Sequence, residues 1–150
     1  MKNIFEKSVT DELINRINQL TIESKPNWGK MSVDQMLAHC NVTYEFEFED
    51  KHPKPKGFKK WIIKILAKNI VVGDKPYKKN SRTAPEFLMT DPKNFETEKS
   101  RLITYLTKTQ ELGEDHFDNK DSHSFGVLTK TEWSNLFYKH LDHHLNQFGV

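Results

Sequence analysis

Apolar side chains recur every three or four residues along most of this chain, the spacing that places them on one face of an α-helix. The first such stretch covers residues 10–22 and opens with Thr10 and Asp11 as candidate caps. Its apolar positions are Leu13, Ile14, Ile17 and Leu20. We therefore expect a helix over residues 10–22, followed by a loop over residues 23–30.

A second helical stretch begins at Ser32 and runs to about Asp50. Ser32 and Gln35 form a capping-box pattern, in which each side chain satisfies a free backbone N–H group of the first turn. The apolar face carries Met36, Leu37, Cys40, Tyr44 and Phe48. His39 lies at the margin of this face. Cys40 points about 100° away from His39, so we interpret Cys40 as a core residue and not as a ligand or nucleophile.

A shorter amphipathic stretch covers residues 58–72, between a proline-rich break at residues 52–57 and Gly73. The apolar side carries Trp61, Ile62, Ile65, Leu66 and Ile70. The opposite side carries Lys60, Lys64 and Lys68. We expect the apolar side to cover the rest of the protein or a dimer partner, with the lysines in solvent. Binding to a membrane surface is the alternative that this pattern leaves open.

The following residues, 74–94, contain three prolines and predict no regular element. Asp91 and Pro92 are expected to start the next helix, as a cap followed by a proline in the first turn. Gly113 is expected to close that helix. Residues 114–128 then predict a loop.

A second capping box, Thr129 with Glu132, starts the last predicted helix. Strand signals are weak throughout the chain. We therefore expect an all-α fold in a single domain over residues 1–150. Its simplest architecture is an antiparallel bundle of four long helices with a short extra helix at residues 58–72.

Composition excludes some classes of protein. The chain has 150 residues, of which 35% are hydrophobic and 11% aromatic, and this is enough for one ordinary core. No apolar run approaches the ~18 residues of a membrane span. Residues 1–13 lack the apolar stretch of a secretory signal, and Cys40 is the only cysteine. We expect a cytoplasmic protein, with the reservation that a mature secreted chain would also lack a signal.

The net charge of +2 is unevenly spread. Residues 51–80 hold ten lysines and one acid, Asp74, which gives +9, and the remainder carries 13 basic and 20 acidic residues, which gives −7. We interpret this as local basicity and do not expect nucleic-acid binding.

Three of the seven histidines, His140, His143 and His144, fall in the last predicted helix. On a helix, His140 and His144 lie one turn apart and about 40° apart in projection. Trp133, Phe137, Leu141, Leu145 and Phe148 project on the same side. His143 projects on the other side of His140. Burying an unpartnered imidazole costs about 1–3 kcal/mol, so this pair needs a partner.

A shared divalent metal ion is one such partner, because first-row metals bind neutral imidazole nitrogens. His39 borders an apolar face on another helix and is the candidate for a third ligand. Three protein ligands leave positions for water or substrate, as in catalytic metal sites. The alternative is a hydrogen-bonded histidine cluster without an ion. Glu47 and His143 are candidates for proton handling and Gln147 for holding a ligand, with solvent-exposed or structural roles as alternatives.

Several short motifs together resemble one known family. They are residues 28–32 (WGKMS), 35–40 (QMLAHC), 123–126 (HSFG), 132–133 (EW), 140–145 (HLDHHL) and 147–149 (QFG). In combination they resemble the DinB/YfiT-like superfamily, in a branch known as a domain of unknown function. The resemblance covers essentially the whole chain, although residues 51–90 match poorly.

The resemblance implies a four-helix up-down-down-up bundle, usually dimeric. It also implies a divalent metal ion, for which we consider Zn, Ni, Fe or Mn, held by His39, His140 and His144. His143 matches a histidine that commonly accompanies the pair without ligating. Some relatives are metal-dependent S-transferases that use low-molecular-weight thiols such as bacillithiol, mycothiol or glutathione, and others have no assigned activity.

Two main function hypotheses follow. The first is a metal-dependent thiol S-transferase or hydrolase that acts on a small molecule, where the ion lowers the pKa of a bound water or thiol. The second is a non-catalytic metal- or ligand-binding stress-response module whose lysine-rich helix contacts a partner. A bundle that keeps the histidines without a metal is a third possibility.

Overall fold

The computed structural model describes residues 1–150, except for the side chains of Lys59, Lys60 and Lys64. In this part of the chain there are five α-helices, one short 3-10 helix and one two-stranded antiparallel sheet. The helices are α1 (Lys7–Gln19), α2 (Val33–Phe48), α3 (Gly57–Val72), η1 (Pro85–Phe87), α4 (Phe95–Phe117) and α5 (Lys130–Gln147). The strands are β1 (Lys120–Ser122) and β2 (Gly126–Leu128). The chain is therefore predominantly helical, as the apolar spacing predicted.

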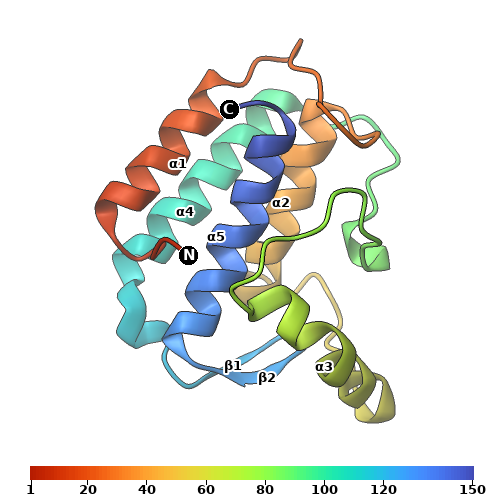
Figure 1. Ribbon diagram of the computed structural model, residues 1–150, viewed down its shortest axis with the longest axis vertical. Helices are drawn as coiled ribbons and strands as arrows, with labels where there is room; N and C mark the ends of the chain where they lie inside the picture. Colours follow the sequence, from red (N-terminus) through yellow and green to blue (C-terminus); the bar gives the residue numbers. More distant parts are fainter.

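Helices α1, α2, α4 and α5 lie side by side around one hydrophobic core, with α3 and the hairpin at one end (Figure 1). Side chains from all four helices are fully buried there. They include Leu13, Ile17, Met36, Leu37, Leu102, Leu106 and Phe137. Burying each such side chain stabilises the fold by about 1.5–3 kcal/mol, so the core holds these helices together.

An aromatic layer sets the position of α5 against α2. Phe137 of α5 stacks on Tyr44 of α2 with ring centroids 5.0 Å apart. It also contacts Trp133 at 5.4 Å and Phe117 at 5.5 Å. Ring pairs at these distances stabilise beyond the burial of their area. Because His140 follows Phe137 by one helical turn, this layer brings His140 against α2.

The first helix begins and ends about three residues before the predicted range. The prediction of Thr10 and Asp11 as caps was wrong, because both lie inside α1 and Glu6 is the N-cap. Thr10 is buried, and its hydroxyl donates to the backbone oxygen of Ile4 at 2.7 Å. The buried side of this helix therefore begins before residue 10, where the predicted helix began.

The ends of α4 also differ from prediction. Asn94 caps this helix, and its side chain accepts a hydrogen bond from the backbone N–H three residues on, at 2.9 Å; Asp91 and Pro92 lie outside the helix. Gly113 does not close the helix. The backbone bends there at φ +74°, which suits glycine, and a further helical turn runs to the buried Phe117.

The expected loop over residues 114–128 contains the β1–β2 hairpin, so that prediction was wrong. Lys120 stands opposite Leu128, and Ser122 opposite Gly126. The Ser122 hydroxyl donates to the Gly126 oxygen at 2.8 Å. Strands of three residues are too short for an alternating pattern to be recognised.

Three local predictions are confirmed. The Ser32 backbone N–H donates to Gln35 Oε1 at 3.2 Å, and the Thr129 N–H donates to Glu132 Oε2 at 2.9 Å, as capping boxes require. Cys40 is fully buried, and burial raises the pKa of its thiol. The thiol is therefore neutral at physiological pH, consistent with a core residue.

Helix α3 is attached to α5 near its C-terminal end. Asn135 of α5 donates to the Val72 oxygen at 3.0 Å, and Lys139 of α5 donates to the Ile70 oxygen at 2.8 Å. These bonds satisfy carbonyl groups that the end of a helix leaves unpaired. Burial lowers the pKa of Lys139 to about 8.

The expectation that the apolar side of α3 covers the rest of the protein was wrong, while its packing against a dimer partner stays a prediction. Lys68 pairs with Glu132 of α5 at 2.8 Å, so this lysine faces the protein. The apolar side is exposed at Phe58, Trp61, Ile65, Leu66 and Ile70. The predicted positions of Lys60 and Lys64 lie outside the described side chains. Over the described residues, every helix is too short or too polar to cross a bilayer.

Candidate metal centre

Three histidines from two helices meet between α2 and α5. His39 lies on α2, and His140 and His144 lie on α5. Each offers one ring nitrogen, and the three nitrogens lie within 4.8 Å of one another. The structure thus brings together the three residues that the sequence analysis named as ligands, and this arrangement could hold a metal ion.

The spacing of the nitrogens fits a single ion. His39 Nε2 lies 3.0 Å from His140 Nε2. Two imidazole nitrogens bound to one tetrahedral zinc ion at its usual bond length lie about 3.3 Å apart. The third ring also lies close, because the ring centroid of His144 lies 4.5 Å from that of His39 and the three nitrogens lie within 4.8 Å of one another. Small side-chain adjustments would therefore complete the site.

Hydrogen bonds to the other ring nitrogens fix two of the three tautomers. His39 Nδ1–H donates to the backbone oxygen of Phe87 at 2.8 Å, and His144 Nδ1–H donates to Gln147 Oε1 at 2.8 Å. Both oxygens can only accept, so each Nδ1 carries the hydrogen and each Nε2 keeps its lone pair. This is the supporting pattern that metal-binding histidines have in proteins.

The loop after α1 sets the orientation of Gln147. The Gln147 Nε2 donates to the Trp28 oxygen at 2.6 Å, so Oε1 must face His144. Gly29 allows this approach, because a Cβ atom there would lie 2.5 Å from Gln147 Nε2. Its φ of +83° also favours glycine. Trp28 and Gly29, near the start of the chain, thus position Gln147, near its end.

Thr43 supports His140 in a different way. Its hydroxyl oxygen lies 2.9 Å from His140 Nδ1 and can donate or accept. Without an ion, His140 Nε2–H donates to His39 Nε2. In the tautomer that binds a metal, Nδ1–H donates to Thr43 and both Nε2 lone pairs are free. The cluster is therefore hydrogen-bonded in either state.

Burial keeps the three rings neutral. His39 is 4% exposed and His144 is 8% exposed, while His140 is partly buried. Burial lowers the pKa of all three side chains, and that of His144 to about 3. Neighbouring histidines lower the pKa of His140 and His144 further. Neutral imidazole is the form that binds zinc, iron and nickel, so this donor set fits such an ion.

Aromatic side chains from residues 73–94 cover the cluster. The Phe87 ring lies 5.2 Å from that of His39 and 5.6 Å from that of His140. The Tyr77 ring lies 6.4 Å from that of His140. Neither residue was predicted from the sequence, because their segment has no periodicity. Two aromatic residues in a polar, proline-rich stretch were the only signal.

His143 lies beside the cluster without joining it. Its ring is 5.1 Å from that of His144 and contacts Trp28 at 5.8 Å and Tyr77 at 5.6 Å. The side chain is partly exposed, and burial lowers its pKa. This position beside the cluster agrees with the helical projection, in which His143 falls on the other side of His140.

Glu47 lies at a different cavity. Its carboxylate is almost fully buried and pairs with Lys120 of β1. Both line a cavity of about 310 Å³ that also contains Phe46 and His123. Phe46 stacks on His123 at 4.0 Å and contacts Phe87 at 5.3 Å. Aromatic rings thus stand between this cavity and the three histidines.

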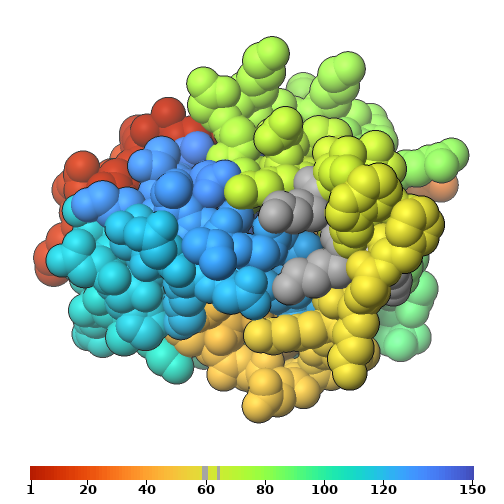
Figure 2. All heavy atoms as spheres, turned by 90° about the horizontal axis from the view of Figure 1, so that it is seen from below, coloured from red at the N-terminus to blue at the C-terminus, as the bar shows by residue number. Residues whose placement is uncertain are grey.

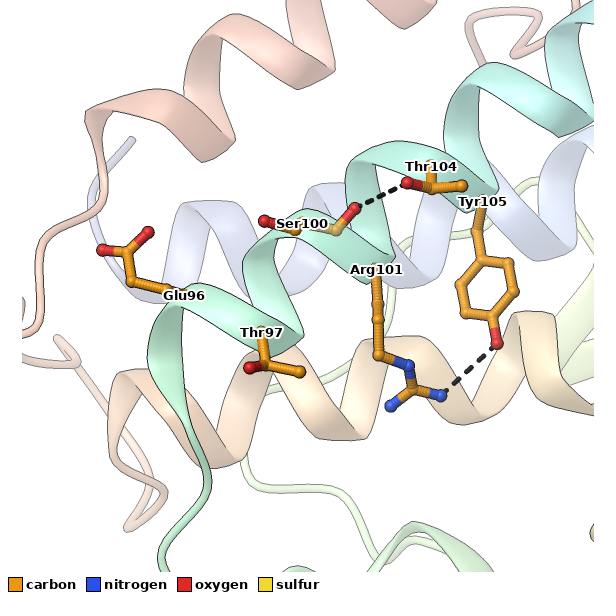
Figure 3. Close-up of a pocket in the computed structure, with 6 residues that line it drawn as sticks. All are labelled: Glu96, Thr97, Ser100, Arg101, Thr104 and Tyr105. Atoms are coloured by element: carbon orange, nitrogen blue, oxygen red, sulfur yellow. Dashed lines mark hydrogen bonds between the residues drawn. The ribbon is translucent and has the colours of Figure 1, made fainter.

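A larger surface groove, of about 520 Å³, runs along α4 (Figure 3). Its lining residues are Glu96, Thr97, Ser100, Arg101, Thr104 and Tyr105. All lie on one helix and several are already paired with each other. Thr104 Oγ1 donates to the Ser100 oxygen at 2.9 Å, and Arg101 donates to the Tyr105 hydroxyl at 3.3 Å. The groove contains none of the three histidines.

The role of Gln147 is directly testable. Replacing it by leucine removes the acceptor of His144 Nδ1–H, so we expect the affinity for Zn²⁺ to fall about 10–100-fold. Calorimetric titration of metal-stripped protein measures this. Gln19→Leu, at an exposed position on α1, is the matched control and should bind as the wild type does. Equal affinity of the two variants would show that Gln147 does not orient His144.

Comparison with known proteins gives one result. A family model described as "Protein of unknown function (DUF1569)" matches residues 5–149. Neither the curated proteins nor the solved structures contain a significant match.

Proposed function

The chain belongs to the DUF1569 family of proteins of unknown function, and from this premise we propose that it is a divalent-metal-dependent enzyme acting on a small molecule. Thiol S-transfer and hydrolysis are the two reaction classes that we consider. The observation that carries the proposal is the convergence of His39, His140 and His144 within 4.8 Å. Three neutral nitrogen ligands leave coordination positions for a substrate.

An ion bound there would supply Lewis acidity, which stabilises negative charge that develops on a substrate or a thiol. The protein's own part is positioning. The Phe87 carbonyl and the Gln147 amide hold two rings with their Nε2 atoms directed inward. The ring of Phe87 packs against His39, and that of Tyr77 lies beside His140. Of the two residues proposed for proton handling, His143 lies beside the cluster and Glu47 does not.

We further propose that α1, α2, α4 and α5 form the up-down-down-up bundle of the DinB/YfiT-like superfamily. The support is the pairing of a histidine on α2 with the HxxxH of α5. A low-molecular-weight thiol as co-substrate, a homodimer and a cytoplasmic location belong to the same proposal. The metal is then Zn, Ni, Fe or Mn.

A non-catalytic metal- or ligand-binding stress-response module is the second candidate. The observation in its favour is the closure of the site. His39 and His144 are nearly buried, and Phe87 and Tyr77 cover the cluster. A substrate needs access to the nitrogens past these rings, whereas a permanently bound ion does not.

Elemental analysis of the purified protein tests both candidates. We expect about one equivalent of a first-row metal. Metal-stripped protein should gain roughly 5–10 °C in Tm when Zn²⁺ is added at about 100 times its Kd. The experiment contradicts metal binding if the protein is metal-free and no tested ion raises Tm.

A panel of thiols and electrophiles, assayed with the metal-loaded protein, then separates the two candidates. Turnover that chelation abolishes and added metal restores supports the enzyme. Normal metal binding with no turnover across the thiol and ester panels supports the non-catalytic module.

A further inference from the structure

Helix α3 presents a broad, mostly apolar side to solvent, in which Asn69 is an exposed polar exception. Ten large hydrophobic side chains are exposed in the described part of the chain, and half of them lie on this one helix. They are Phe58, Trp61, Ile65, Leu66 and Ile70, and each is more than 50% exposed. At about 100° per residue, the five side chains fall within about half of the circumference of the helix. An exposed apolar patch of this kind marks an interaction surface.

The rest of the fold holds this face outward. Lys68, which projects beside Trp61 at the margin of this side, pairs with Glu132 of α5. Val72 is buried, and its oxygen accepts a hydrogen bond from Asn135. Turning the apolar face toward the protein would break both contacts. Figure 1 shows α3 extending away from the other helices toward its N-terminal end, and in Figure 2 its residues form one margin of the molecule.

The charge around α3 identifies the kind of partner. Residues 51–80 carry ten lysines and one acid, Asp74. Exposed lysines flank both ends of the helix. They are Lys54 and Lys56 before it and Lys75, Lys78 and Lys79 after it. Two copies that met through this face would bring two strongly positive segments together, and the like charges would repel. A surface of negative charge with an apolar layer beneath it is complementary to the helix.

We propose that α3 binds the surface of an anionic phospholipid bilayer. The apolar face enters the boundary between headgroups and acyl chains, and the flanking lysines contact the phosphates. With 16 residues the helix is about 24 Å long, and it lies in the plane of the interface. Phe58 and Trp61, whose rings stack at 5.6 Å, suit the headgroup level. Membrane attachment is independent of the histidine cluster and adds a location to the proposed function.

Vesicle flotation with the full-length protein tests this proposal. We expect the protein to float with vesicles of phosphatidylglycerol and phosphatidylcholine, and to stay at the bottom with phosphatidylcholine alone. Salt at about 0.5 M should weaken the binding, because it screens the lysines. Tryptophan emission should shift to the blue when anionic vesicles are added. Trp61→Phe should lose this shift but still float, because Trp28 and Trp133 lie elsewhere.

Two pairs of variants assign the binding to α3. Ile65→Ser with Leu66→Ser should lower the apparent vesicle affinity at least tenfold, whereas Ile22→Ser, at an equally exposed site on a loop, should leave it unchanged. Lys54→Glu with Lys56→Glu should weaken binding at least fivefold for each lysine. Lys25→Glu with Lys30→Glu is the control, because it makes the same change in net charge at sites away from α3. All positions are exposed, and circular dichroism checks that the variants fold.

Failure of the wild-type protein to float with anionic vesicles would overturn the proposal. Equal loss of binding in the two lysine pairs would also overturn it, since binding would then follow net charge alone. Light scattering supplies a further test. A wild-type dimer that Ile65→Ser with Leu66→Ser converts to a monomer would show that a second copy occupies this face instead.

Discussion

His144→Ala is expected to lower the affinity for Zn²⁺ more than about a hundredfold, while His143→Ala leaves it within about threefold. The two residues are adjacent on α5, but only His144 directs a lone pair toward His39 and His140. His143 contacts Trp28 and Tyr77 at the rim. Competition with a chromophoric chelator measures both affinities, after the metal has been removed from each protein.

The pair of variants separates a ligand from a neighbour of the same chemical type. His140→Ala should behave as His144→Ala does, because it removes a second of the three nitrogens. All three variants should keep the helical circular dichroism of the wild type, since the core beneath α5 is intact. The proposed ligand set is wrong if His143→Ala loses as much affinity as His144→Ala, or if neither loses any.

Phe137→Ala is expected to lower the free energy of unfolding by about 3–5 kcal/mol. Phe137 is fully buried, stacks on Tyr44 and Trp133 and meets Phe117 edge to face, so truncation leaves a cavity in the aromatic layer between α2, α4 and α5. Urea denaturation followed by circular dichroism measures the change. A loss this large would remove a substantial part of the stability of a domain of this size.

Phe58→Ala is the matched control, because it makes the same chemical change on α3 at a side chain that is 72% exposed. Its effect should stay within about 0.5 kcal/mol. Equal losses in the two variants would mean that the aromatic layer does not anchor α5.

The Phe137 variant should also bind Zn²⁺ more weakly, because the layer sets the position of His140 relative to His39.

Helix formation was predictable because its signals are local. Apolar spacing identified every long helix, and the boxes at Ser32 and Thr129 marked two starts within one residue. The rotation of about 100° per residue placed His140 and His144 on one face and His143 beside it. Where the local signals were short or weak, as at the hairpin, at Gly113 and at the start of α1, the predictions failed.

The partners of the histidines were not predictable from local signals. Phe87 lies 48 positions from His39 and comes from a segment without periodicity, yet its carbonyl fixes the tautomer of that ring. The Trp28 oxygen, 119 positions from Gln147, decides which way that amide points. Gln147 was a candidate for holding a ligand, and the structure shows that this ligand is His144.

The orientation of α3 shows the same limit. Its sequence showed an apolar side and a basic side, but both orientations toward the protein fit that pattern. The pairing of Lys68 with Glu132, and the bond from Asn135 to Val72, turned the apolar side outward. Periodicity along a chain reports which residues share a face, because that depends on bond geometry within a few residues. Which face meets which neighbour depends on the packing of segments far apart in the chain, and only the tertiary structure contains it.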